Sequence, residues 1–261
     1  MSSVRADAGA TPAVGPRGTI TWLGHATVLL VTRSGTRIIF DPWIEGNPKS
    51  PVTIDDLGAI DAIAVTHGHF DHMGSVIPLA SATGAVVVCV PEMAAYFGSV
   101  GVTNIVEMNK GGTITIGEVS LTMVSADHSC GIAVGENTLL AYGGNPVGFV
   151  VRLPDGEGGP VYVSGDTNVF GDMSLIRDLY APEIGLMPID GHYNMGPREA
   201  AHAVGLLGLN RVVPYHYGTF PLLAGTPAEL GDHLRSGASR ATVLPIEPGQ
   251  SVAIGAHHSV G

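Results

Sequence analysis

The chain has 261 residues, of which only 13% are charged, and its formal net charge is −11. A chain of this length can bury a large core in one or two domains, so the number of domains has to come from the sequence pattern. The acidic balance and the scattering of the twelve Lys and Arg residues disfavour a nonspecific role on nucleic acid or on an anionic membrane surface.

Residues 1–17 are polar and rich in Ala, Gly and Pro, and they predict a disordered tail ahead of a single domain over residues 18–261. The tail lacks the apolar segment of a signal peptide, and no later stretch has the length and apolarity of a membrane span. Only Cys89 and Cys130 are present, which is fewer than the disulfide framework of a small secreted domain uses. We therefore expect a cytoplasmic protein with reduced thiols and no membrane partner.

The first half of the chain predicts an antiparallel β-meander that gives way to alternating strands and helices. Short β-branched or apolar runs between glycine-containing turns are typical of strands. In chain order we expect strands at 19–22, 27–32, 37–40 and 60–66, a helix over 71–80 that Pro78 ends or kinks, a strand at 86–90, a helix over 91–97 and a strand at 105–107.

The second half repeats this progression from meander to mixed β/α structure. We expect strands at 113–116, 119–125, 147–153, 161–164, 184–188, 211–214, 242–244 and 251–254, and helices at 174–179, 197–207 and 227–235. Two such halves favour an α/β fold in which two sheets pack together and helices cover them.

Residues 67–72, with the sequence His-Gly-His-Phe-Asp-His, hold four good metal ligands directly after an apolar strand. Residues two apart on an extended loop point to the same side, so His67 and His69 can meet one ion. The turn into the following helix then directs Asp71 and His72 toward a neighbouring ion. Solvated or capping residues in an ordinary loop would not explain this clustering of a scarce residue type at ligand spacing.

Three later segments each place a single ligand after an apolar strand, namely His128, Asp166 and His216. Each alone is as consistent with a cap or a satisfied polar residue as with a ligand. Because the ends of adjacent strands are where a scaffold brings distant residues together, the three can complete two metal sites.

The order and intervals of these residues resemble the metallo-β-lactamase superfamily, over nearly the whole chain after the tail. The resemblance implies a four-layer αββα metallo-β-lactamase sandwich and two metal ions. It implies seven metal ligands: His67, His69, Asp71, His72, His128, Asp166 and His216. By the same resemblance, His67, His69 and His128 hold the first ion. Asp71, His72 and His216 hold the second, and Asp166 bridges the two ions.

Four further segments resemble a narrower group of the superfamily. That group includes uncharacterised bacterial metal-dependent hydrolases, the L-ascorbate-6-phosphate lactonases and, more distantly, N-acyl phosphatidylethanolamine phospholipase D. The segments are Trp22-Leu23-Gly24-His25-Ala26-Thr27, Asp41-Pro42, Ser164-Gly165-Asp166-Thr167 and residues 191–197, Gly-His-Tyr-Asn-Met-Gly-Pro. The likeness is closest to the uncharacterised members, so it names no substrate.

The ligand set predicts a metal-dependent hydrolase that cleaves an ester, lactone, amide or phosphodiester bond of a small molecule. Two divalent ions, most simply zinc, with Mn or Fe also compatible with the ligands, would generate hydroxide near neutral pH. Asp71 is predicted to orient this hydroxide, and His192 to stabilise developing negative charge or to protonate the leaving group. The alternative for His192 is a loop histidine packed on Tyr193.

Several other polar positions keep two interpretations. His25 and Asp41 each follow a strand and are either hydrogen-bond partners that orient a metal ligand or simple turn residues. Cys130 either lines the site or, as we favour, is a small packing residue. The remaining histidines have no matching partner and are expected on the surface or in the core: His202, His233, His257 and His258.

Three other functions compete with small-molecule hydrolysis. The same ligands support a phosphodiesterase or nuclease, which the acidic balance disfavours, and with iron they support an oxidoreductase. A purely structural metal module is disfavoured because structural zinc sites are saturated by four protein ligands.

The loops at 44–54, 133–146 and 217–226 carry no recognisable substrate code, although their apolar content suggests a small or moderately apolar substrate. The apolar stretch 220–223 is a candidate contact in a homo-oligomer.

Overall fold

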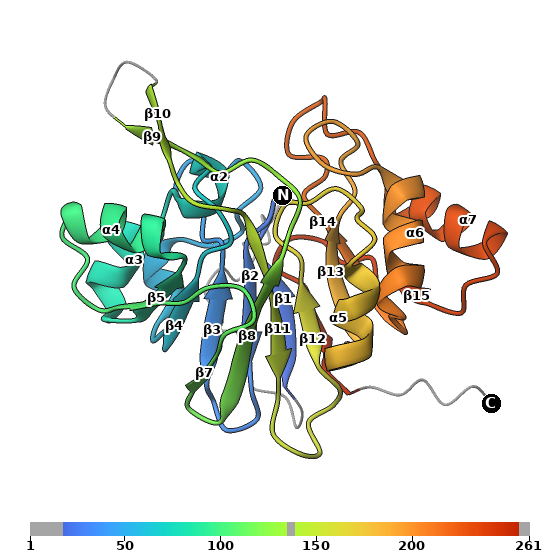
Figure 1. The fold of residues 1–261 in the computed structure, drawn as a ribbon, viewed down its shortest axis with the longest axis horizontal. Coiled ribbons are helices and arrows are strands. Elements are labelled where there is room, and N and C mark those ends of the chain that lie inside the picture. Colours follow the sequence, from blue (N-terminus) through green and yellow to red (C-terminus); the bar gives the residue numbers. More distant parts are fainter. Residues whose placement is uncertain (1–17, 135–138, 256–261) are drawn as a thin grey trace, which may run out of the picture.

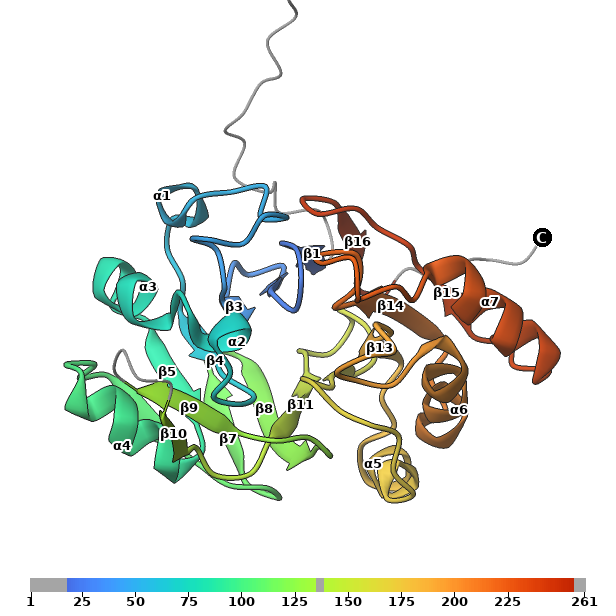
Figure 2. The same ribbon diagram turned by 90° about the horizontal axis from the view of Figure 1, so that it is seen from above.

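Two seven-stranded sheets pack face to face in the computed structural model, which describes residues 18–134 and 139–255 (Figure 1). The first sheet has the strand order β16-β1-β2-β3-β4-β5-β6, and the second has the order β15-β14-β13-β12-β11-β8-β7. Strands β9 and β10 form a separate hairpin. Seen from above, helices α3 and α4 lie beside β4 and β5, and helices α5 to α7 lie beside β13 to β15 (Figure 2). The predicted four-layer αββα sandwich is confirmed.

The strands of the first sheet are β1 (Thr19–Trp22), β2 (Val28–Val31), β3 (Arg37–Phe40), β4 (Ala62–Ala64), β5 (Val86–Cys89), β6 (Ile105–Glu107) and β16 (Ser251–Ala253). Those of the second sheet are β7 (Thr113–Ile116), β8 (Val119–Ser125), β11 (Val147–Arg152), β12 (Val161–Val163), β13 (Ile184–Pro188), β14 (Arg211–Tyr215) and β15 (Thr242–Val243). The hairpin consists of β9 (Gly131–Val134) and β10 (Leu139–Tyr142).

The helices are α1 (Ile54–Leu57), α2 (Phe70–Met73), α3 (Val76–Thr83), α4 (Pro91–Ser99), α5 (Met173–Tyr180), α6 (Pro197–Leu207) and α7 (Pro227–Ser236). None of the helices within the described ranges is long and apolar enough to cross a membrane.

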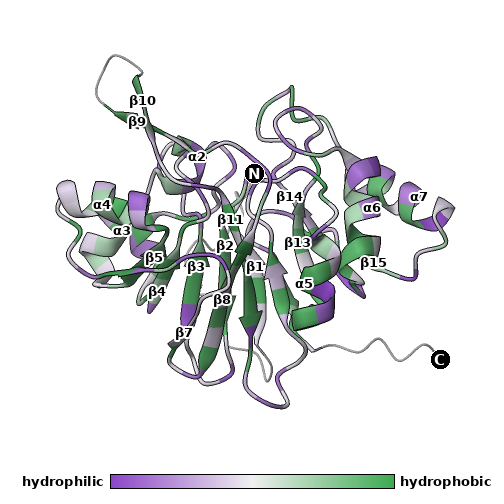
Figure 3. Ribbon diagram, in the orientation of Figure 1, coloured by the Kyte–Doolittle hydropathy of each residue, from purple (hydrophilic) through white to green (hydrophobic). Residues whose placement is uncertain are grey.

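One apolar core joins the two sheets and another joins the second sheet to its helices. Figure 3 shows hydrophobic residues along the strands of both sheets. Phe40 of the first sheet and Phe149 of the second are fully buried, with ring centroids 5.9 Å apart. A separate cluster packs Met187 of β13 with Val204 of α6 and Leu230 of α7. Burial of this kind, worth about 25 cal/mol per Å² of apolar surface, holds the layers together.

The helix predicted over 71–80 is instead two helices, and the prediction of its end was wrong. The chain breaks between α2 and α3, where Ser75 accepts hydrogen bonds from Ile44 N (2.9 Å) and Glu45 N (3.2 Å). Pro78 is the third residue of α3, where a backbone N–H has no partner within the helix, so α3 continues to Thr83. The four-residue α1 and the β9–β10 hairpin were not predicted.

Strand direction explains why one edge of the fold collects polar residues. Strands β3 to β6 are parallel to one another, and so are β12 to β15. β1 runs in the direction of β3, and β8 runs in the direction of β12, because in each case one antiparallel strand lies between them. The residues that follow these strands therefore emerge at the same edge.

Candidate metal centre

The first group of potential ligands is His67, His69 and His128, whose ligand atoms all lie within 4.8 Å of one another. His67 and His69 come from the loop after β4, and His67 Nε2 lies 2.9 Å from His69 Nδ1. His128 follows β8 in the second sheet, and its ring centroid is 5.1 Å from that of either other histidine. The three residues therefore converge from both sheets.

The second group contains Asp71, His72 and His216, together with His25. Asp71 and His72 lie on α2, and His216 follows β14. His72 and His216 are fully or almost fully buried, whereas the side chain of Asp71 is 16% exposed.

Asp166 lies between the two groups and is 2% exposed. Its Oδ1 is 3.2 Å from His72 Nε2, and its Oδ2 is 3.2 Å from His216 Nε2 and 3.6 Å from His128 Nε2. The structure thus brings all seven predicted ligands together, and Asp166 contacts His128 of the first group as well as His72 and His216 of the second.

Three buried polar atoms at the centre of this cluster have no hydrogen-bond partner of proper geometry: His72 Nε2, His216 Nε2 and Asp166 Oδ1. A buried polar atom without a partner costs roughly 1–3 kcal/mol, so such atoms are rare in a folded protein. A divalent ion would satisfy all three because imidazole nitrogen and carboxylate oxygen are its usual ligands. The residues present therefore fit a divalent cation.

Asp41 and Asp190 hold two of the ligand rings. Asp41, at the end of β3, accepts hydrogen bonds from Thr66 N (2.7 Å), Thr66 Oγ1 (2.6 Å) and His72 Nδ1 (2.8 Å). Asp190, just after β13, lies with its Oδ2 3.1 Å from His216 Nδ1. In both cases the ring is oriented with Nε2 toward Asp166.

His25 contacts two other residues of the second group, Asp71 and His216. Its Nε2 lies 2.8 Å from Asp71 Oδ2, and its Nδ1 lies 2.9 Å from Thr219 Oγ1. The His216 backbone N–H donates to His25 O (3.0 Å), and the two rings are 3.9 Å apart. His25 and Asp41 are therefore hydrogen-bond partners of candidate metal ligands and not simple turn residues.

Three of these residues have a left-handed backbone: His25 (φ 54°), Asp41 (φ 46°) and His216 (φ 56°). A non-glycine residue rarely adopts this conformation. At each position it turns the chain sharply as it leaves a strand, next to the site.

The two groups of histidines differ in charge preference. Burial lowers the pKa of His67, His69 and His128, which favours the neutral ring that a metal ion needs. Burial also opposes the charged form of His72, but Asp166 and Asp41 outweigh it and raise its pKa to about 10. These carboxylates provide a site for positive charge between the two sheets.

The loop after β13 is built around Asp190, which the sequence analysis missed. Asp190 Oδ1 accepts from the backbone N–H groups of His192 (2.8 Å), Tyr193 (2.8 Å) and Asn194 (3.2 Å). Asp190 follows an apolar strand as Asp41 does, and this position in the sequence could have identified it as a candidate site residue.

His192 is exposed and packs edge-on against Tyr193, with ring centroids 4.7 Å apart, while Tyr193 lines the cavity over the ligands. The catalytic role of His192 stays a prediction.

Cys130 supports the ligand loop from outside the cavity. Its Sγ accepts from Gly68 N (3.3 Å), and its thiol donates to Gly143 O (3.1 Å). Burial raises the pKa of this thiol. These contacts agree with the packing role that we favoured.

A cavity of about 420 Å³ opens onto both groups of ligands. It is lined by His25, His69, Phe70, Asp71, His128, Ser129, Gly131, Ala133, Leu140, Asp166, Tyr193, His216, Phe220, Leu222 and Leu223. Because it reaches Asp71, Asp166, His69 and His128 directly, this cavity is the route by which a small molecule would reach the ligands.

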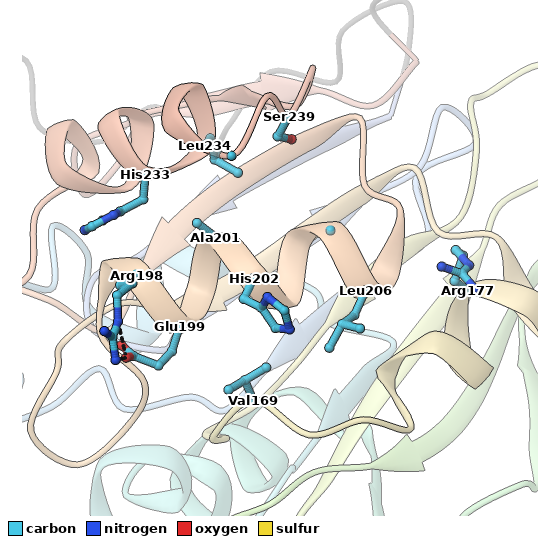
Figure 4. Close-up of a pocket in the computed structure, with 12 residues that line it drawn as sticks. Val169, Arg177, Arg198, Glu199, Ala201, His202, Leu206, His233, Leu234 and Ser239 are labelled. Carbon is cyan, nitrogen blue, oxygen red and sulfur yellow. Dashed lines mark hydrogen bonds and ion pairs between the residues drawn. The ribbon is translucent and has the colours of Figure 1, made fainter.

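Another cavity, of about 660 Å³, lies over helices α6 and α7 (Figure 4). His202 and His233 line it, but neither belongs to any cluster of three potential ligands within the described ranges. Arg198 is paired with the adjacent Glu199 at 2.8 Å. This cavity has no comparable chemistry, and His257 and His258 lie outside the described residues.

Comparison with known proteins gives one family. The family model described as "Beta-lactamase superfamily domain" matches residues 36–217. A protein named UPF0173 metal-dependent hydrolase from Koribacter versatilis is 46% identical over 211 residues, covering 81% of this chain and 89% of the relative. Its namesake from Rubrobacter xylanophilus is 46% identical over 233 residues, covering 89% of this chain and 95% of the relative.

Among solved structures, Igni18 is similar over nearly its whole length. This metallo hydrolase from the archaeon Ignicoccus hospitalis has a TM-score of 0.79 and 31% identity, covering 92% of this chain and 99% of the other.

Proposed function

This chain belongs to the beta-lactamase superfamily and, within it, to the UPF0173 metal-dependent hydrolases, and from this premise we propose a dinuclear mechanism on a small-molecule substrate. The proposed reaction is hydrolysis of an ester, lactone, amide or phosphodiester bond. The oxygen of one water joins the acyl or phosphoryl atom, and a proton passes to the leaving group.

The observation that carries the dinuclear proposal is the position of Asp166. Its Oδ1 faces His72 and its Oδ2 lies near both His216 and His128, so this one carboxylate reaches histidines of both groups. Oδ1 has no hydrogen-bond partner of proper geometry although Asp166 is almost fully buried. A carboxylate in this position suits two cations better than one. Two divalent ions, with zinc as the first expectation, would supply Lewis acidity and lower the pKa of a water molecule to about 7.

The protein groups around the ions have separate tasks in this proposal. Asp41 and Asp190 fix the rings of His72 and His216, and His25 fixes Asp71. The partly exposed carboxylate of Asp71 faces the cavity, where it can orient a water molecule and accept its proton.

His192 is proposed to act only after a movement, since it is not among the residues that line the cavity. In that case a His192→Ala variant would lower kcat with little change in metal content.

The proposal is tested by elemental analysis of the purified protein and by hydrolysis of lactone, phosphodiester and amide panels before and after chelation. About two equivalents of metal and chelator-sensitive hydrolysis are expected. His69→Ala should lose metal and turnover, whereas the matched control His202→Ala on α6 should keep both. One equivalent of metal or less would overturn the dinuclear site. Iron with oxygen uptake and no hydrolysis would favour an oxidoreductase.

We also infer a cytoplasmic location. Cys89 and Cys130 are both buried, unpaired thiols, which suits a reducing compartment. Fractionation of the source cells would test this inference, and recovery of the protein outside the cytoplasm would contradict it.

A further inference from the structure

We propose that the substrate is a neutral ester, lactone or amide that carries an aliphatic chain or an aromatic ring next to the bond that is cleaved. This inference rests on the proposed hydrolase function and narrows it, since it selects uncharged carbonyl compounds over phosphorylated or carboxylated ones. The evidence is the composition of the walls of the 420 Å³ cavity over the metal ligands.

Three separate segments build an apolar wall around the ligands. Phe70 comes from the first turn of α2, Leu140 from the β9–β10 hairpin, and Phe220 and Leu222 from the loop after β14. Figure 1 shows the hairpin projecting at the same edge of the fold as α2. The polar ligands thus form the floor of the cavity and apolar side chains form much of its rim.

The exposure of these side chains is unusual for a protein surface. Ten large apolar or aromatic residues are exposed in the described ranges, and five of them line this one cavity: Phe70, Leu140, Tyr193, Phe220 and Leu222. Scattered apolar residues are common on surfaces, but a concentration of them in one place marks a binding surface. Here the concentration surrounds the proposed reaction site.

The hairpin register directs one leucine to the cavity and its neighbour away from it. Leu140 pairs with Ala133, and both line the cavity. Leu139 pairs with Val134, and neither lines it. Side chains of successive strand residues point to opposite faces, so the contribution of Leu140 is specific to its face.

The lining has no permanently charged basic side chain. None of its residues is Lys or Arg. A phosphate or carboxylate remote from the cleaved bond would lose water on entering the cavity and would find no Arg or Lys to pair with. A neutral apolar group has no such desolvation cost, and its burial against Phe70, Leu140 and Leu222 stabilises the complex.

The inference is tested by the binding of alkyl hydroxamates to the metal-loaded full-length protein, measured by calorimetry. A hydroxamate binds metal through its head group and leaves its chain to the cavity. Since each buried methylene is worth about 0.8 kcal/mol, each is expected to tighten binding about fourfold. Hexanohydroxamate has four more methylenes than acetohydroxamate, so it should bind on the order of 100-fold more tightly. Adipic monohydroxamate, which has the same chain ended by a carboxylate, should bind at least about tenfold more weakly than hexanohydroxamate.

Two variants locate the effect on the hairpin. Leu140→Ser should reduce the advantage of hexanohydroxamate over acetohydroxamate several-fold. Leu139→Ser is the matched control, because Leu139 and Leu140 are 71% and 70% exposed and only Leu140 lines the cavity. Leu139→Ser should leave both affinities unchanged.

The outcomes separate this inference from the proposed function. Equal affinity along the chain series, or tighter binding of the carboxylate-ended compound, in a protein that holds metal would overturn the apolar assignment and leave the hydrolase standing. A protein that holds no metal would instead overturn the proposed function.

Discussion

Replacing Asp41 by Asn should weaken one of the two metal sites proposed above. Asn tolerates the left-handed backbone of position 41 as well as Asp does, and the shape of the side chain is kept. The amide oxygen of Asn can still accept a hydrogen bond from Thr66 N, as Asp41 Oδ1 does at 2.7 Å. The amide NH₂ then takes the place of Oδ2 and faces His72 Nδ1, which lies 2.8 Å from that oxygen.

The NH₂ group changes which ring nitrogen of His72 is available to a metal. It donates a hydrogen bond where the carboxylate accepted one, so His72 Nδ1 becomes the acceptor and the ring proton moves to Nε2. Nε2 is the atom that faces Asp166. A protonated Nε2 cannot bind metal, so affinity at the second site should fall by about 10- to 100-fold, or roughly 1.4–2.7 kcal/mol.

The assay is a titration of metal-free protein with zinc against a competing chelator. Asp41→Asn should keep one tight equivalent at His67, His69 and His128 and lose affinity for the other. Asp61→Asn is the control, because Asp61 Oδ2 accepts from Arg37 N (2.8 Å) at an exposed position away from the ligands. Two tight equivalents in Asp41→Asn would refute the tautomer argument.

Three further predictions concern other contacts. His25→Ala removes the partner of Asp71 and should weaken metal binding about tenfold with the circular dichroism spectrum unchanged; wild-type affinity would contradict the role given to His25. Thr226→Ala removes the cap that accepts from Glu229 N at the start of α7, and should lower the unfolding free energy in urea by about 1 kcal/mol; an unchanged midpoint would count against it. Burial, with a smaller effect of nearby negative charge, raises the pKa of Cys89 to about 12, so the thiolate is scarce at about pH 8; iodoacetamide should label Cys89 only after unfolding, and labelling of native protein would contradict this.

Much of the fold was predictable because its strands are locally consistent. The predicted bounds of β1, β3, β6, β7, β8, β13 and α6 are those of the structure. In these elements the ends follow from local sequence signals, such as an apolar run or Pro197 in the first turn of α6. The convergence of the candidate metal ligands was predictable for a related reason. Most of them follow strands that deliver their carboxyl ends to one edge, and Asp71 and His72 lie on α2, directly after His67 and His69.

Features that depend on contacts between distant segments were not predictable in the same way. The break before α3 depends on Ser75, which accepts from the backbone of Ile44 and Glu45, thirty residues earlier in the chain. The hairpin has two short apolar runs, but Leu139 and Leu140 are exposed, so their pattern does not follow the burial that usually defines a strand. The apolar wall of the cavity likewise exists only when α2, the hairpin and the loop after β14 meet.

The left-handed residues at the candidate site lower the stability of the folded chain. Within the described ranges it uses glycine at seventeen positive-φ positions, yet it keeps His25, Asp41 and His216 at three others. Each such conformation costs of order 1 kcal/mol, which glycine would avoid. Glycine would also remove the side-chain hydrogen bonds of His25 and Asp41, so the backbone strain and the candidate site are retained or lost together.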